Sequence, residues 1–168
     1  MKKFTFFFIW VIIIISCTLI YAKKDKFQDL QNELIALVMP TRGYYKNNVA
    51  EYFISNNGHF VITTKVNNHQ INFLFDTGAS SIVLTRNDAI NAGINVDSLN
   101  YNNLISTANG TNYIAYTTIK QLQIFNKIFT NLPVAITKTG LDQSLLGMSF
   151  LKHVQSYTIN NNKLTINF

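Results

Sequence analysis

The chain has 168 residues, enough for one ordinary hydrophobic core but short of what two full domains usually need. Its formal net charge of +6 suggests a nucleic-acid or membrane surface at first sight, but five of its 14 basic residues flank one apolar segment near the N-terminus. The rest of the chain carries nine basic and seven acidic residues, without a basic stripe interleaved with aromatics, so we expect no nucleic-acid binding.

The first 22 residues contain a run without charge, Phe4 to Ala22, which is long enough to cross a bilayer as one helix. Lysines on both sides favour a retained single-pass transmembrane signal anchor over residues 1–22. Two alternatives stay open: cleavage after Ala22, or lipidation at Cys17, because Ile14-Ile15-Ser16-Cys17 is similar to a bacterial lipobox. A very short N-terminal tail usually stays inside the cell, so an anchor would place the bulk of the chain outside the cytoplasm, in the periplasm or at the surface.

Residues that could bind metal are few and scattered. Cys17 is the only cysteine, so a disulfide within the chain is impossible and a thiolate metal site is not expected. The three histidines, His59, His69 and His153, fit no metal-ligand spacing. We therefore expect no metal site.

Residues 23–48 are expected to form a spacer between the apolar segment and the rest of the chain. From Asp25 to Met39 apolar residues recur at helical spacing, and Pro40 ends the pattern. This pattern predicts a short amphipathic helix that lies on the membrane or on the folded domain. The alternative is a linker that the protein itself cuts.

Beyond Val49 the pattern becomes that of short strands, and we assign residues 49–168 to one folded domain. Thr85 is expected to cap a short helix that carries Asp88 in its first turn and stops at Gly93. A second short helix is expected over 149–153. The expected strands are 60–66, 71–75, 81–84, 104–107, 113–116, 119–125, 128–132 and 134–136, followed by a hairpin around 160–162. Many short strands with one or two small helices predict a compact all-β, barrel-like domain.

The tripeptide Asp76-Thr77-Gly78 occurs once, between the apolar strand 71–75 and the next apolar run. A carboxylate at the mouth of a buried strand, inside a turn of small residues, is placed for acid–base chemistry. The alternative is a turn carboxylate that caps nearby amides, an everyday role of Asp next to Gly. Two further elements favour catalysis, because they follow in order within one domain length: the hairpin signal Asn109-Gly110 and the run Ser144-Leu145-Leu146-Gly147.

Residues from about 58 to 168 resemble the retropepsin-like aspartic proteases, in particular the bacterial, membrane-anchored branch with a single Asp-Thr-Gly per chain. The resemblance is carried by residues 73–80, by the flap-like residues 107–111 and by residues 145–151. It implies a small closed β-barrel-like fold with one or two short helices, active as a two-fold homodimer. It also implies an aspartic endopeptidase that acts on protein or peptide substrates and needs no cofactor.

The resemblance implies that Asp76 and its symmetry mate hold one water between them. Two carboxylates about 3 Å apart repel by about 5 kcal/mol at an effective dielectric constant of 20, so near neutrality they share one proton. The ionised carboxylate would act as a base on the water and the protonated one would polarise the scissile carbonyl, which implies best activity at mildly acidic pH. Ala79, rather than Ser, follows the tripeptide, as in retroviral and related dimeric enzymes.

The same resemblance assigns supporting roles to neighbouring residues. Thr77 would lock the two turns together across the dimer axis, and Gly78 would present an N–H to the carboxylate. Leu146 and Gly147 would pack against the catalytic loop, where Gly147 leaves room that a side chain would fill. The tip Ala108-Asn109-Gly110 would close over a substrate held as an extended strand. A non-catalytic dimeric peptide-binding or scaffold module of the same fold remains the alternative.

Overall fold

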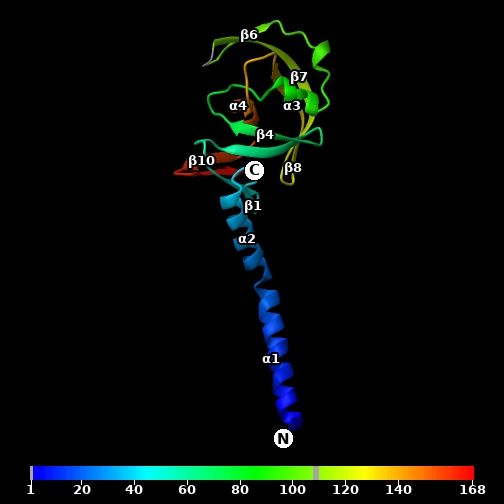
Figure 1. Cartoon of the computed structure of the whole chain (residues 1–168), viewed down its shortest axis with the longest axis vertical. Helices are drawn as coiled ribbons and strands as arrows, with labels where there is room; N and C mark the ends of the chain where they lie inside the picture. The colour runs from blue at the N-terminus through cyan, green and yellow to red at the C-terminus, as the bar shows by residue number, and fades with distance from the viewer. Residues whose placement is uncertain (1, 108–109) are drawn as a thin grey trace. The chain divides into compact units, whose positions relative to one another are not determined.

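The computed structural model describes residues 2–107 and 110–168 (Figure 1). The chain divides into two compact units, Met1–Ile35 and Ala36–Phe168. The helices at the start of the chain are α1 (Lys2–Ala22) and α2 (Lys24–Val38), the second of which covers the segment with helical apolar spacing. Among the residues whose placement is described, no helix is both long enough and apolar enough to span a membrane.

A seven-stranded sheet in the second unit closes on itself. Its strands are β3 (Val61–Val66), β4 (His69–Phe75), β5 (Val83–Leu84), β6 (Asn103–Thr107), β7 (Gly110–Ile124), β8 (Lys127–Thr137) and β9 (Ser144–Leu146). Their order is β3-β4-β9-β5-β8-β7-β6. The pairs Lys65↔Gln123 and Val66↔Leu122 join β3 to β7 and complete a ring, while β6 continues outward from β7 (Figure 1). The expected all-β, barrel-like fold is confirmed.

A smaller antiparallel sheet packs against this barrel. Its order is β1 (Tyr44–Lys46), β2 (Val49–Phe53), β11 (Lys163–Asn167) and β10 (Ser156–Asn160). Alternate residues of the two inner strands, Ala50 and Tyr52 of β2 and Leu164 and Ile166 of β11, are fully buried and join the main core. All five residues of β10 are exposed, and β10 forms one edge of the sheet.

Two short helices and a 3₁₀ turn complete the second unit: α3 (Arg86–Asn91), α4 (Met148–Leu151) and Val96–Ser98. The Thr85 side chain accepts a hydrogen bond from the backbone N–H of Asp88 at 3.0 Å, and Gly93 follows α3 with φ +75°. The expected N-cap and stop of this helix are therefore confirmed. The second helix starts one residue earlier than the sequence indicated.

The strands β7 and β8 are longer than the sequence predicted. Separate strands were expected over 113–116 and 119–125, and a break was expected at Pro133, but both strands run without interruption. Pro133 is tolerated because β8 pairs with β5 only at Ala135 and Ile136, so its first half has a neighbour on one side alone. A proline without an N–H fits such an edge position.

Tyr52 has an unusual environment for a tyrosine. Its side chain is fully buried and its ring packs against Phe125, with centroids 6.0 Å apart. No hydrogen-bond partner for its hydroxyl is found in the described part of the chain. Burial raises the pKa of the Tyr52 hydroxyl, because the charged phenolate would lose its hydration.

The buried hydroxyl predicts a particular loss of stability at alkaline pH. In the unfolded chain tyrosine ionises near its ordinary pKa of about 10, whereas the folded chain keeps Tyr52 protonated to higher pH. The contribution of protonated Tyr52 to the free energy of unfolding is therefore complete below pH about 10 and is lost as pH rises further. We expect the free energy of unfolding to fall less steeply above pH about 10 in Tyr52→Phe than in the wild type, measured by urea denaturation from neutral to alkaline pH. The control, Tyr116→Phe at an exposed position, should keep the wild-type slope; parallel slopes in all three chains would contradict the prediction.

Candidate active site

Asp76 follows β4 and opens the loop that leads to β5. The short strand β9 lies between these two strands: Phe75 pairs with Leu146 in parallel, and Val83 pairs with Leu145 in the antiparallel sense. The backbone N–H of Asp76 donates to the carbonyl of Leu146 at 3.2 Å. The carboxylate therefore emerges where a buried strand ends, on a loop whose two ends are fixed by the same central strand.

The carboxylate of Asp76 is oriented by its own loop. Its Oδ1 accepts a hydrogen bond from the backbone N–H of Gly78 at 2.8 Å. The backbone N–H of Ala79 donates to the Asp76 carbonyl at 3.3 Å, which tightens the turn. Asp76 is half-buried, while Thr77 and Gly78 are exposed. The hydrogen bond from Gly78 therefore fixes the orientation of a carboxylate that still faces solvent.

The other half of the loop is held by the start of α4. The backbone N–H groups of Met148 and Ser149 donate to the carbonyls of Ala79 and Ser80 at 2.8 and 3.0 Å. The Ser149 hydroxyl accepts a hydrogen bond from the backbone N–H of Ile82 at 2.9 Å. Helix N-terminal N–H groups lack partners within the helix, so the loop carbonyls satisfy donors that would otherwise be open.

Gly147 lies between β9 and α4, where the chain passes close to the backbone of the Asp76 loop. A Cβ atom on Gly147 would lie 2.3 Å from the carbonyl oxygen of Ser81 and 2.4 Å from that of Ala79. Its φ of −94° is open to any residue, so the need for glycine comes from space and not from backbone strain.

Ser144 is a supporting residue to which the sequence analysis assigned no role. It is fully buried at the start of β9. Its hydroxyl accepts from the backbone N–H of Thr85 at 3.0 Å and donates to the Asp88 carboxylate. These contacts fasten β9 to the start of α3. The sequence offered one signal: Ser144 stands directly before two leucines of an apolar strand. A hydroxyl buried among such residues needs hydrogen-bond partners.

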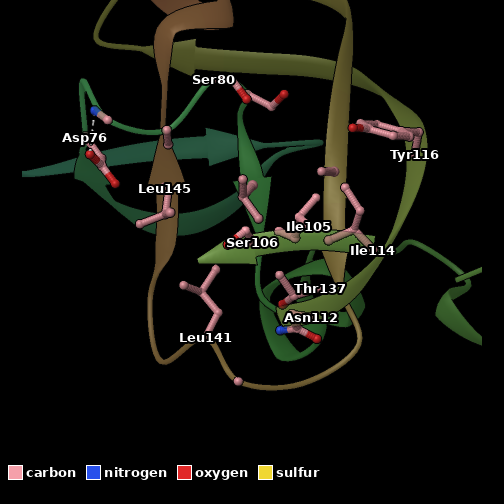
Figure 2. A pocket seen from close by; sticks show the side chains of 16 residues that line it. Asp76, Ser80, Ile105, Ser106, Asn112, Ile114, Tyr116, Thr137, Leu141 and Leu145 are labelled. Atoms are coloured by element: carbon pink, nitrogen blue, oxygen red, sulfur yellow. Dashed lines mark hydrogen bonds between the residues drawn. The ribbon is translucent and has the colours of Figure 1, made fainter. Parts of the chain in front are cut away.

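A cavity of about 680 Å³ opens beside the Asp76 loop (Figure 2). One wall is the loop itself. The facing wall is a hairpin of residues 103–107 and 110–113, here called the flap hairpin, which contributes Ile105, Ser106 and Asn112. The remaining lining is mostly apolar and comes from Val83, Ile114, Tyr116, Ala135, Leu141 and Leu145, with Thr137 and Gly140. Among the described residues that line the cavity, Asp76 carries the only carboxylate.

The structure brings some of the expected site residues together and leaves others aside. Asp76, Gly78 and Ala79 line the cavity, whereas Leu146 is buried behind the loop and Gly147 packs against it. Gly110 opens β7 and pairs with Thr107. Ala108 and Asn109, expected at the flap tip, lie outside the described residues.

Two cavity-lining residues of β7, Asn112 and Ile114, were not singled out by the sequence analysis. Asn112, Ile114 and Tyr116 all line the cavity and alternate along β7. A strand places every second side chain on the same face, so this spacing was a usable signal. The sequence could not indicate which face of the strand would meet the cavity.

No group of three His, Cys, Asp or Glu side chains that could hold a metal ion occurs in the part of the chain that the structure describes.

Comparisons with known proteins relate the sequence and the fold of this chain to one family. A family model described as gag-polyprotein putative aspartyl protease matches residues 62–153. The uncharacterized protein RP867 of Rickettsia prowazekii (strain Madrid E) is 33% identical over 161 residues, which are 95% of this chain and 69% of that protein. The crystal structure of a retropepsin-like aspartic protease from Rickettsia conorii is 36% identical, with a TM-score of 0.65 over 71% of this chain and 99% of that one. EIAV protease in complex with the inhibitor HBY-793 is 15% identical, with a TM-score of 0.52 over 63% of this chain and 97% of that one, and shows likeness of fold alone.

The close approach at Gly147 predicts a large cost for the smallest possible side chain. Gly147→Ala should lower the free energy of unfolding by about 3 kcal/mol, because the new methyl group meets backbone atoms that cannot rotate away. Urea denaturation of the purified chain measures this difference. The matched control is Met148→Ala, one residue along and partly exposed, for which we expect a loss below about 1 kcal/mol. An equally small loss of unfolding free energy in both variants would show that the loop and α4 can separate at little cost.

Proposed function

Because the chain belongs to the family of gag-polyprotein putative aspartyl proteases, we propose that it is a retropepsin-like aspartic endopeptidase that hydrolyses peptide bonds. The observation that carries this proposal is the Asp76 carboxylate, oriented by the Gly78 N–H at the wall of a cavity large enough for peptide side chains. Among the described lining residues this carboxylate stands alone. We therefore propose a homodimer in which each chain contributes one Asp76.

The proposed mechanism needs two carboxylates with one proton between them. The ionised Asp76 takes a proton from a water held between the pair, and that water attacks the scissile carbonyl. The protonated Asp76 polarises the carbonyl oxygen, and the pair then delivers a proton to the leaving amine. Activity should be highest at mildly acidic pH, where the pair is singly ionised. Neither a metal ion nor a cofactor enters any of these steps.

Strand β10 is the surface proposed for dimer formation. One of its edges pairs with β11, and the other is the open edge of the sheet. An open strand edge invites pairing with another strand. Ile159 and Tyr157 on this strand are 50% and 36% exposed, so antiparallel pairing with the same strand of a second chain would cover apolar surface as well as complete the backbone hydrogen bonds.

The position of β10 next to the Asp76 loop supports this dimer. The ring of Tyr157 meets the ring of Phe75 edge-on, with centroids 5.5 Å apart. Phe75 directly precedes Asp76. A two-fold axis beside β10 would therefore bring both Asp76 loops toward one junction. In this dimer the exposed Thr77 of each chain would approach the other loop.

For the N-terminal segment we propose a single-pass anchor over residues 1–22, with the folded unit outside the cytoplasm. The uncharged run from Phe4 to Ala22 and its flanking lysines support this proposal. It is independent of the catalytic proposal, since the second unit contains the whole Asp76 loop and cavity.

Replacing the catalytic carboxylate tests the proposed activity. The full chain in detergent is incubated with a broad peptide mixture between pH 4 and 8, and products are identified by mass spectrometry. Wild type should cleave best at mildly acidic pH, and Asp76→Asn should lose at least about 100-fold in rate, the lower range for removing a general acid–base group. Asp76→Asn should keep the wild-type melting temperature and dimer mass.

The same assay separates an enzyme from a scaffold. Equal behaviour of wild type and Asp76→Asn on the mixture would favour the non-catalytic, peptide-binding module. Cleavage by a chain shown to be monomeric at the assay concentration, or a rate maximum above neutrality, would contradict the shared-proton pair.

A charge on the open edge of β10 tests the proposed dimer surface. Ile159→Lys should raise the dimer dissociation constant at least about tenfold, because pairing would bury two lysines near the two-fold axis. Sedimentation velocity over a concentration series measures it, and peptide cleavage should fall in parallel. The matched control is Ile128→Lys on β8, where an isoleucine is 56% exposed away from this edge. Unchanged association of Ile159→Lys would place the dimer surface elsewhere.

A further inference from the structure

The flap hairpin is attached to the barrel by strand pairing at its base and by Ile105, which packs against the buried cluster of Val83, Ile114 and Ala135. Pairing of β7 with β8 begins at Ile114↔Thr137, and beyond that point the recorded strand pairs of the hairpin join β6 and β7 to each other. One backbone hydrogen bond continues the link, from the N–H of Lys138 to the carbonyl of Tyr113 at 3.0 Å. The position of the hairpin over the cavity therefore depends on contacts near its base.

Asn112 supplies a side-chain contact at this base. Its Nδ2 amide donates to the carbonyl of Thr139, and its Oδ1 accepts a hydrogen bond from the backbone N–H of Tyr113 at 2.8 Å. The same side chain thus joins the hairpin to the segment 137–141, which begins at the last residue of β8. Asparagine suits the position because it offers a donor and an acceptor at once.

The segment 137–141 is shaped around this amide. Gly140 has φ +74°, a left-handed conformation that favours glycine. A Cβ atom on Gly140 would lie 3.1 Å from Nδ2 of Asn112, tighter than an ordinary contact. Space and backbone conformation at Gly140 therefore both accommodate the bond between Asn112 and Thr139.

The two ends of this bridge lie on neighbouring segments at one end of the cavity, where Asn112 and Thr137 lie side by side (Figure 2). Asn112 lines the cavity together with Ile105 of the flap hairpin, and Thr137 and Leu141 line it from the other segment. The bond between Asn112 and Thr139 continues the pairing of β7 with β8 and holds the base of the hairpin to the segment. It therefore limits how far the hairpin moves relative to the segment at this end of the cavity.

We propose that Asn112 is a positioning residue whose amide clasps the flap hairpin to the segment 137–141 and thereby sets how tightly a peptide substrate is held. The inference rests on the proposed function for its substrate. The clasp acts on KM and leaves the chemical step nearly unchanged, because the Asp76 carboxylate is oriented by Gly78 in a separate loop. A single hydrogen bond is weak enough to open for substrate entry and strong enough to bias the hairpin toward closure.

Hydrogen exchange measures the clasp without any need for catalysis. The full chain carrying Asp76→Asn is compared with the same chain carrying Asn112→Ala or Asn112→Asp. Asn112→Asp keeps the shape and the acceptor but loses the donor. Both should reduce the protection of amides in residues 103–107 and 110–113 by roughly three- to tenfold, the effect of one lost hydrogen bond, while β3 and β4 keep theirs.

The matched control is another asparagine of the same hairpin. Asn103 donates its side-chain amide to Asn102 at 2.9 Å and is exposed. Asn103→Ala should leave the exchange of the hairpin unchanged. Equal exchange in wild-type and Asn112 variants, or an equal loss in Asn103→Ala, would overturn the clasp. Loss of protection in β3 and β4 as well would also overturn it, since the effect would then be global.

Kinetics connect the clasp to substrate binding. With a peptide that the wild type cleaves, Asn112→Ala and Asn112→Asp should raise KM roughly three- to tenfold and change kcat less than about twofold. Gly140→Ala should act in the same direction and add little to Asn112→Ala, because both break one contact.

Each outcome of the kinetic experiment has a separate meaning. A fall in kcat at constant KM would place Asn112 in the chemical step and overturn the inference. Full additivity of Gly140→Ala and Asn112→Ala would show that the two residues act independently and would overturn it as well. If the wild type cleaves no peptide, the proposed function fails, while hydrogen exchange still decides whether the clasp exists.

Discussion

The backbone of Gly147 lies against the carbonyls of Ala79 and Ser81, and the shape of the Asp76 loop depends on this contact. Because no Cβ intervenes, the N–H groups of Met148 and Ser149 reach loop carbonyls and hold them. The Asp76 end of the loop is tied to β9 in the same way, through the carbonyl of Leu146. The loop that carries the carboxylate is therefore held by backbone groups of a strand and a helix that the barrel core keeps in place.

This constraint explains why one chain presents an oriented carboxylate beside a cavity. The Asp76 carboxylate has its orienting hydrogen bond and a cavity beside it, yet the described cavity lining contains no second carboxylate. The same region carries an open strand edge, β10, linked to the Asp76 strand through Tyr157 and Phe75. A single lining carboxylate and an uncovered strand edge near it are physically consistent with the proposed site that two chains share.

Much of the fold could be predicted because it is encoded over short distances. The cap of α3 by Thr85, for example, involves Asp88, which is only three positions further along the chain. The long strands β7 and β8 were predicted in pieces, because Pro133 reads as a break until the single-sided pairing of that stretch is known. Closure of the barrel through Lys65↔Gln123 joins residues too distant in the chain for any local pattern to indicate.

The candidate site shows the same division between features encoded locally and features that depend on distant residues. The sequence by itself determined Asp76-Thr77-Gly78 at the end of an apolar strand and the later run that ends in Gly147, because both are contiguous patterns with a local physical cause. Only the tertiary structure decided that Ser144 fastens β9 to α3, that the flap hairpin faces the loop, and that Asn112 bonds to Thr139. Those contacts join segments that are far apart along the chain, and their partners are selected by how the closed barrel packs, which no short stretch of residues specifies.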